Sequence, residues 1–495
     1  MSALSLSISD PNFFKLIDNP YPVWYNCRVV SDDTHERKQI MKNTNTDVCA
    51  VELARRINEH SKVFPSSKGA FMQISYLVSK GTYDRFISEA EASGFSAVST
   101  DCDTKHVFSV YESKREVLYV LYMTSTEELR LIWEKKRDLR SYADDGCGKV
   151  EIMQIGIGNY GDHGDNPMVG MAYIVKLANS HALLIDGGFD NEGYADNIYR
   201  AMEKFGIAKD GDKFIIDAWY ITHLDGDHVG ILKGFFAKYS EKAIIHSFVQ
   251  NFPVGDPAVI NGAYAPIGND YISLMERTYP EAEVITAHPS SVFEYSGAKI
   301  KILSAAELHY SVFAKLMDGN DASLVFMLET EGAKALFMGD AGEISSRSMY
   351  YAYGKESLKC DVFQIPHHGL TTGYSVFTRP FCEHAYLSKI YEATEADINL
   401  LPMGETFNSV GNHAYGNNQR KAVFEGYPQN AYFLGSKEDN FGYDGKNIIT
   451  KTMPDGRIMT TYLMSTDTEP MITVIGVSEG KAKVLLNETL ADFFA

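Results

Sequence analysis

The sequence lacks several features that would place it in familiar classes. Its six cysteines are scattered and include no Cys-x-x-Cys pair, which excludes a disulfide framework and a zinc knuckle and fits a reducing compartment. No apolar run approaches the ~18 residues of a membrane-spanning helix. The first ten residues have no basic segment and too short an apolar core for a signal peptide. These absences predict a cytoplasmic location and no membrane partner.

The charge balance argues against one class of partner. The chain carries 65 acidic and 46 basic residues, for a formal net charge of −19. Such a chain repels a polyphosphate backbone, and its only dense basic run is 135–137. We therefore expect a small-molecule substrate and no binding to nucleic acid, and a homo-oligomer is left open.

Apolar and aromatic residues are abundant. Hydrophobic residues make up 45% of the chain, with 30 Tyr and 27 Phe, which supports a large buried core. A length of 495 residues predicts two or three domains. We expect a small α+β domain over 1–145, a main domain over 150–465 and a C-terminal strand extension over 466–495. The charged segment 135–146 ends in glycine and is the expected linker.

One stretch organises the chain, because four metal-capable side chains fall within six positions. The apolar run 213–221 predicts a buried strand, and the apolar residues that follow recur at helical spacing. The turn between them lies where an α/β sheet opens a ligand crevice, and Gly226 would allow a tight bend there. Imidazole and carboxylate together suit zinc, iron or manganese. The candidate ligands are His223, Asp225, Asp227 and His228.

A simpler interpretation of the same stretch is a capped helix start. Asp227 would then be the N-cap residue, and the two histidines would face solvent. That interpretation suits a lone Asp-His pair. Four such residues at this spacing favour the metal site instead.

Three further apolar runs end in polar residues, in a fixed order along the chain. They are Leu183-Leu-Ile-Asp-Gly-Gly188, Ala335-Leu-Phe-Met-Gly-Asp340 and Val362-Phe-Gln-Ile-Pro-His-His-Gly369. With the central motif they resemble the metallo-β-lactamase superfamily, whose His-x-His-x-Asp-His signature has Asp225 here in place of the second histidine. This variant is similar to the branch of competence-type DNA-uptake hydrolases and a choline-phosphate esterase of bacterial cell walls, and closest to uncharacterised bacterial members.

The resemblance covers roughly residues 150–460. It implies an α+β fold, an αββα four-layer sandwich preceded by the small α+β domain. It also implies two divalent metal ions, with Zn favoured and Mn or Fe as alternatives. One cation would be held by His223, Asp225 and Asp340, and the other by Asp227, His228, Asp340 and either His367 or His368.

The adjacent histidines 367 and 368 carry a further expectation. On an extended segment neighbouring side chains diverge, so only one of the pair should bind metal and the other should face the substrate. The resemblance makes Asp227, His367 and His368 the candidate catalytic residues. Asp186 is expected to orient a metal-binding histidine by hydrogen bonding, and Asn320 and Ser323 to face the site from their strand.

Two parts of the chain depart from the family pattern. The third motif of the family supplies a histidine between the central motif and Asp340, and no histidine here aligns with it; those available are His246, His288 and His309. In a late loop, Asn417 and Asn418 replace the family's His-Pro. The loop histidines His163 and His413 are candidate substrate contacts.

Together these features predict metal-dependent hydrolysis with a metal-bound water as nucleophile, because no Ser or Cys nucleophile is indicated. The carboxylate-rich ligand set favours a phosphoester, a phosphodiester or another small ester as substrate. One alternative is a competence-type nuclease. The other, prompted by the absent third-motif histidine, is a non-catalytic metal-binding module with a degenerate site.

Overall fold

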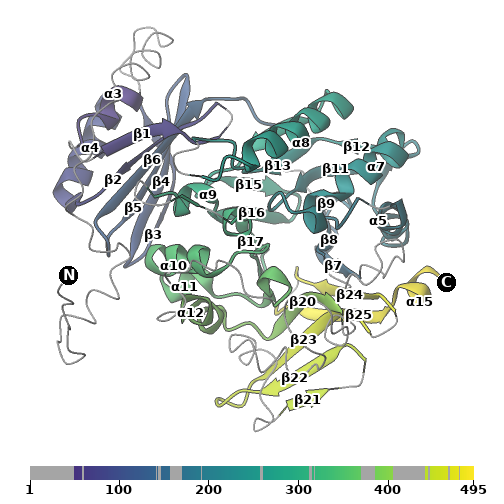
Figure 1. Cartoon of the computed structure of the whole chain (residues 1–495). Coiled ribbons are helices and arrows are strands. Elements are labelled where there is room, and N and C mark those ends of the chain that lie inside the picture. The colour runs from purple at the N-terminus through teal and green to yellow at the C-terminus, as the bar shows by residue number, and fades with distance from the viewer. Residues whose placement is uncertain are drawn as a thin grey trace, which may run out of the picture. The chain divides into compact units, whose positions relative to one another are not determined.

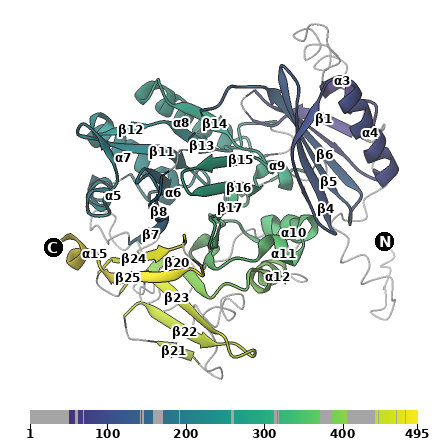
Figure 2. The same ribbon diagram turned by 180° about the vertical axis from the view of Figure 1, so that it is seen from behind.

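Three β-sheets with helices packed on them make up the described part of the chain (Figures 1 and 2). The computed structural model describes residues 50–57, 61–67, 69–140, 142, 146–156, 170–190, 192–256, 260–311, 315–316, 318–369, 385–404, 441–443, 446–466, 469–478 and 480–495. Residues 50–495 belong to one unit, and the domain boundaries near 145 and 465 stay predictions. No helix among these residues has the length and apolar character needed to cross a membrane.

The first sheet is wholly antiparallel and has the strand order β1-β2-β6-β5-β4-β3. Its strands are β1 (Ser61–Pro65), β2 (Phe71–Ser75), β3 (Ser96–Cys102), β4 (His106–Glu112), β5 (Glu116–Met123) and β6 (Glu128–Lys135). Helices α3 (Ala50–Ala54) and α4 (Lys80–Ala92) pack on one face, where Tyr83 of α4 stacks on Tyr122 of β5 at 4.6 Å.

The second sheet has ten strands, and its main order is β14-β13-β11-β9-β8-β7-β24-β25. Its strands are β7 (Glu151–Ile155), β8 (Ala172–Lys176), β9 (Ala182–Asp186), β10 (Lys209–Asp210), β11 (Lys213–Tyr220), β12 (Ala243–Ile245), β13 (Ser247–Gln250), β14 (Glu283–Thr286), β24 (Met471–Gly476) and β25 (Lys483–Thr489). Within the expected C-terminal extension, β24 and β25 form a hairpin, and β24 pairs with β7. The last strands therefore complete the sheet that carries the central motif.

Helices cover one face of the ten-stranded sheet. They are α5 (Glu192–Lys204), α7 (Ile231–Tyr239), α8 (Tyr264–Thr278) and α15 (Leu490–Phe494). Ile198, Phe235 and Met275 from three of these helices share a buried cluster with Trp219 of β11. The helical spacing of the apolar residues after His228 thus places α7 against the strand that precedes it.

The third sheet has the order β15-β16-β17-β18-β19-β20-β23-β22-β21. Its strands are β15 (Val292–Tyr295), β16 (Ala298–Ser304), β17 (Val325–Glu329), β18 (Lys334–Phe337), β19 (Val362–Gln364), β20 (Ile398–Gly404), β21 (Phe441–Tyr443), β22 (Ile448–Thr452) and β23 (Ile458–Ser465). Nearby helices are α9 (Ala306–His309), α10 (Glu343–Ala352), α11 (Lys355–Leu358) and α12 (Ala385–Thr394). Tyr391 of α12 packs against Phe363 of β19 at 5.5 Å.

The two larger sheets share a buried apolar layer. Tyr173 of β8 contacts Phe337 of β18, and Tyr220 of β11 contacts Phe326 of β17, with ring centroids 5.2 and 5.1 Å apart. Residues of both sheets belong to the same buried cluster. This packing fixes the relative position of the strand ends that carry the polar motifs, and the chain is a sheet-rich α+β structure.

Candidate metal centre

The predicted site residues gather beyond the carboxyl ends of four strands. Asp186 is the last residue of β9, and His223 follows β11, to which β9 is parallel. Asp340 follows β18, and the His367–His368 pair follows β19, to which β18 is parallel. Because the carboxyl ends of parallel strands meet at one edge of a sheet, the residues of each pair lie together. The packing of the two sheets then brings segments up to 182 residues apart, from 186 to 368, into one site.

The central motif forms the short helix α6 (Gly226–Val229), with Asp225 at its N-cap position. Asp227 and His228 lie within the helix, and both motif histidines are buried. The capped-helix interpretation, with Asp227 as N-cap and solvent-facing histidines, is therefore wrong. The glycine that this turn requires is Gly230 and not Gly226. A side chain at Gly230 would place its Cβ 2.2 Å from the Gly226 carbonyl oxygen, whereas a Cβ at Gly226 would meet only Phe189, at 3.9 Å.

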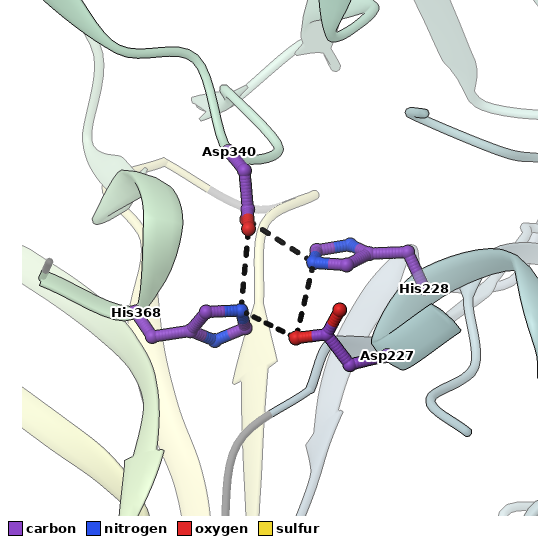
Figure 3. A group of neighbouring side chains, drawn as sticks. All are labelled: Asp227, His228, Asp340 and His368. Carbon is purple, nitrogen blue, oxygen red and sulfur yellow. Dashed lines mark ion pairs between the residues drawn. The ribbon is translucent and has the colours of Figure 1, made fainter. Parts of the chain in front are cut away.

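Four side chains form a compact group at this edge (Figure 3). His368 Nε2 lies 3.1 Å from Asp227 Oδ2 and 3.3 Å from Asp340 Oδ2. His228 Nε2 lies 3.2 Å from Asp340 Oδ1 and 3.8 Å from Asp227 Oδ2. One ligand atom from each of the four residues lies within 4.8 Å of all the others. This arrangement of two imidazoles and two carboxylates is typical of a site for a borderline divalent cation.

Hydrogen bonds at Nδ1 fix the tautomer of three histidines. His228 Nδ1 lies 2.8 Å from Asp186 Oδ2 and His368 Nδ1 lies 2.7 Å from the Pro402 carbonyl oxygen, and both partners can only accept. Thr222 donates its hydroxyl proton to Asp186, so its oxygen accepts from His223 Nδ1 at 3.0 Å. Each Nδ1 therefore keeps its proton, so Nε2 is the atom that takes up either a second proton or a metal ion.

These free nitrogens provide a test of whether a cation fits. Within the described part of the chain, Nε2 of His223, His228 and His368 and Oδ1 of Asp340 are buried without a hydrogen-bond partner. Each orphaned buried polar atom costs about 1–3 kcal/mol. Four of them facing one centre make structural sense as ligands, so the residues fit a bound divalent metal.

The charges of the group are strongly coupled. Burial opposes ionisation of Asp340, but His228 and His368 outweigh it and hold the pKa of this carboxyl well below its usual range. Burial likewise opposes the charged form of His368, yet Asp340 and Asp227 raise its pKa to about 10. Burial lowers the pKa of His367. In the metal-free protein, protons on His228 and His368 therefore neutralise the carboxylates that a cation would neutralise.

Metal affinity should accordingly rise with pH. A histidine with a raised folded pKa stabilises the metal-free protein fully below its unfolded pKa of ~6.5, and this stabilisation is lost as pH rises towards about 10. Each proton displaced by metal adds about tenfold in affinity per pH unit. The increase in Tm on adding Mn²⁺ should be larger at pH 9 than at pH 6. An increase that does not change with pH would contradict this coupling.

Asp186 supports the group from beneath. Its carboxylate accepts hydrogen bonds from the Thr222 amide and hydroxyl, both at 2.7 Å, and from His228 Nδ1. The Trp219 indole donates to its carbonyl oxygen at 2.9 Å. Asp186 has a φ of 51°, which is rare for a residue other than glycine. Such strained backbone is common where a side chain must be held in a functional orientation.

Asp186→Asn should therefore weaken metal binding without abolishing it. Asparagine tolerates the left-handed backbone but accepts through one oxygen instead of two, so the expected loss of metal affinity is ~10–100-fold. Calorimetric titration with Mn²⁺ measures it. Asp217→Asn is the matched control, since Asp217 is a buried carboxylate of the same sheet that contacts His181 and His246. Equal losses in both variants would contradict a specific role for Asp186.

The other predicted residues take different positions. Ser323 Oγ accepts from the Asp340 amide at 3.0 Å, and Asn320 Oδ1 is buried without a hydrogen-bond partner among the described residues. Asp225 is 44% exposed and lies 3.9 Å from His223. The candidate substrate contacts His163 and His413 lie outside the described residues, as do Asn417 and Asn418, which replace the family's His-Pro.

Two contacts at the site were not foreseen. Thr222, which hydrogen-bonds both His223 and Asp186, immediately precedes the motif and could have been found from the sequence. The Pro402 carbonyl oxygen that fixes His368 lies 34 residues away on β20 and carries no side-chain signal. A cleft of about 720 Å³ lies elsewhere, lined by residues of β3–β6 and β14–β17 such as Tyr119 and Phe293, and by none of the candidate ligands.

Comparison with known proteins agrees with this geometry. Residues 165–376 match the model of the metallo-beta-lactamase superfamily. That stretch contains the four-residue group, so the superfamily match and the candidate site fall on the same part of the chain. The search of curated proteins found no match.

Two solved structures show low global similarity. CmlA, a diiron beta-hydroxylase from Streptomyces venezuelae, is 13% identical and has a TM-score of 0.30, with 55% of this chain and 47% of that chain covered. A flavo di-iron protein variant from Thermotoga maritima is 18% identical and has a TM-score of 0.24, with 41% of each chain covered. The chain thus spans less than half the length of these proteins, and the iron in their names is a property of those proteins.

Proposed function

We propose that this protein is a metal-dependent hydrolase that acts on a phosphoester, a phosphodiester or another small ester. The observation that carries the proposal is the convergence of three histidine Nε2 lone pairs on the buried carboxylate of Asp340. The metallo-beta-lactamase superfamily match over residues 165–376 supports it independently. We propose two divalent cations, with zinc favoured.

Each side chain has a distinct part in this proposal. When bound, divalent cations would acidify a water molecule and stabilise negative charge on the reacting ester. Asp227, His228, Asp340 and His368 would hold one cation in a buried setting. Asp186 and the Pro402 carbonyl hold His228 and His368 with Nε2 facing inwards, so little reorganisation accompanies binding.

The charge distribution supports a small substrate over a nucleic acid. Of the only dense basic run, Lys136 pairs with Glu112, and Arg137 lies 3.5 Å from Glu134. Pairing cancels the positive field that a backbone-tracking nuclease needs. The formal net charge of −19 acts in the same direction.

Four finer features belong to the same proposal. The domain would be a four-layer αββα sandwich of the His-x-Asp-x-Asp-His branch, which the apolar layer shared by the two larger sheets and the helices over the ten-stranded sheet support. The sheet of β1–β6 would form a small preceding domain. The location would be cytoplasmic, consistent with the scattered cysteines.

A paired assay tests the function. Purified protein should carry one to two equivalents of Zn, Mn or Fe by elemental analysis. Loaded with Zn or with Mn, it should hydrolyse bis-p-nitrophenyl phosphate and leave a labelled oligonucleotide intact at physiological salt. If the protein contains less than ~0.1 equivalent of metal and takes up none on titration, it is not a metal-dependent enzyme. Processive cleavage of the oligonucleotide would instead establish the nuclease alternative.

A further inference from the structure

The third-motif histidine expected from the family resemblance has no counterpart at the site. His246 Nδ1 contacts Asp217 at 3.1 Å, and His288 Nδ1 contacts Glu307 at 2.9 Å. His309 Nε2 lies 2.9 Å from the Ser304 hydroxyl. All three candidates are thus engaged elsewhere in the fold. A first cation bound by His223, Asp225 and Asp340 would therefore lack one protein ligand.

The backbone at the histidine pair supplies a replacement. Residues 367 and 368 are not extended: their φ angles are 47° and 54°, in the left-handed region. The expectation that their side chains point to opposite faces is therefore wrong. Both Nε2 atoms approach the same oxygen, Asp340 Oδ2, at 3.9 Å for His367 and 3.3 Å for His368. Two successive left-handed residues other than glycine are strained, and such strain clusters at functional sites.

His367 and His368 lie differently about this carboxylate. His368 belongs to the four-residue group and contacts Asp227, whereas His367 lies outside that group. His223 Nε2 also lies 3.9 Å from Asp340 Oδ2, and 3.9 Å from Asp225 Oδ2. His367 Nε2 and His223 Nε2 thus lie at equal distances from Asp340 Oδ2, the oxygen that both cations would share.

We propose that His367 replaces the absent third-motif histidine and completes the first metal position together with His223, Asp225 and Asp340. This inference rests on the proposed metal-dependent function. The two positions are unequal in burial: Asp225, His367 and His223 are 44%, 15% and 1% exposed, whereas Asp227, His228 and His368 are 18%, 0% and 2% exposed. The position that contains His367 therefore exchanges its cation with solvent more readily, and it fills after the more buried position.

Metal titration of matched variants tests this assignment. Metal-free protein titrated with Mn²⁺ should take up two equivalents in two phases that differ by at least about tenfold in affinity. His367→Asn should abolish the weaker phase and keep one tight equivalent. His368→Asn should weaken the tight phase instead. Asparagine tolerates the left-handed backbone, and His181→Asn, at a half-buried histidine paired with Asp217, should change neither phase.

Electron paramagnetic resonance gives a second readout that does not depend on activity. Spin coupling between two Mn²⁺ ions in the wild type should be replaced by a single uncoupled Mn²⁺ signal in His367→Asn. Two equivalents retained in His367→Asn, or both lost, would overturn the assignment. A wild type that binds one equivalent and still hydrolyses esters would overturn it and leave the proposed function standing. If the wild type binds two equivalents and His367→Asn loses only the weaker one, but no ester is hydrolysed, the assignment of His367 stands and the proposed function is overturned.

Discussion

Asp340→Ala should remove bound metal and hydrolysis together. Asp340 is 2% exposed, and its two oxygens face His228 on one side and His368, His367 and His223 on the other. Its loss deprives both metal positions of their shared anion, so metal affinity should fall by more than the ~100-fold upper bound for a residue that only orients a ligand. Elemental analysis after dialysis should find less than ~0.1 equivalent.

The control for this variant is an aspartate of the same sheet that lies outside the candidate site. Asp397 precedes β20 and pairs with Arg457 and Lys481 at the surface. Asp397→Ala should keep one to two equivalents of metal and wild-type hydrolysis. Full metal occupancy in Asp340→Ala would show that Asp340 does not bridge the two positions.

The sequence carried the positions of the site residues because each follows a strongly apolar strand. The run 213–221 predicted β11, and the runs before Asp186, Asp340 and the histidine pair predicted β9, β18 and β19. Strand ends are readable because burial demands a continuous apolar run, and a polar residue after it marks the edge of the sheet. Whether these residues bind metal stays a prediction that the experiments above test.

The backbone conformation of the histidine pair could not be predicted from the sequence. Nothing in the letters Pro-His-His-Gly specifies two left-handed histidines, and an extended segment was the default expectation. The tertiary structure overrides that default, since the His367 amide donates to the Gly339 carbonyl at 3.2 Å and His368 is fixed by Pro402. Gly339 lies in the turn after β18 and Pro402 lies on β20, so only the folded chain shows these partners.

The pairing of strands into sheets could not be predicted from the sequence pattern either. The C-terminal hairpin was predicted without a partner, yet β24 pairs in register with β7, more than 300 residues earlier. The apolar run of β24 signals a strand but not the strand with which it pairs. The same limit hid the contact between the first sheet and the rest of the unit, which combines aromatic packing with buried polar groups.

Arg130→Met should cause the largest loss of stability, without affecting metal binding. Arg130 and Glu128 of β6 form an ion pair with side chains 4% and 1% exposed, and Arg130 also donates to the Glu307 carbonyl of α9. The Glu307 carboxylate in turn accepts from Ser66 at 2.7 Å and His288 at 2.9 Å. Removing the arginine leaves a buried carboxylate unpaired, which costs about 3–5 kcal/mol of unfolding free energy.

Urea denaturation of the wild type and the variant measures this loss, and Mn²⁺ stoichiometry should stay unchanged. Arg56→Met is the control, because Arg56 pairs with Glu89 at 3.4 Å while 55% exposed, and an exposed pair contributes little. Adding Glu128→Gln to Arg130→Met should recover part of the loss, since the buried charge disappears. Equal midpoints for Arg130→Met and Arg56→Met would show that the buried pair does not stabilise the fold.

The pH dependence of that loss identifies its cause. Burial already raises the pKa of Glu128, against the opposing effect of Arg130. Without the arginine, the folded pKa should rise further above the unfolded value of ~4.3. A carboxyl group with a raised folded pKa destabilises the fold increasingly as pH rises from its unfolded to its folded pKa. The deficit of Arg130→Met should therefore be smaller at pH 5 than at pH 8. A deficit equal at both values would mean that lost packing of the arginine side chain, and not an unpaired charge, weakens the fold.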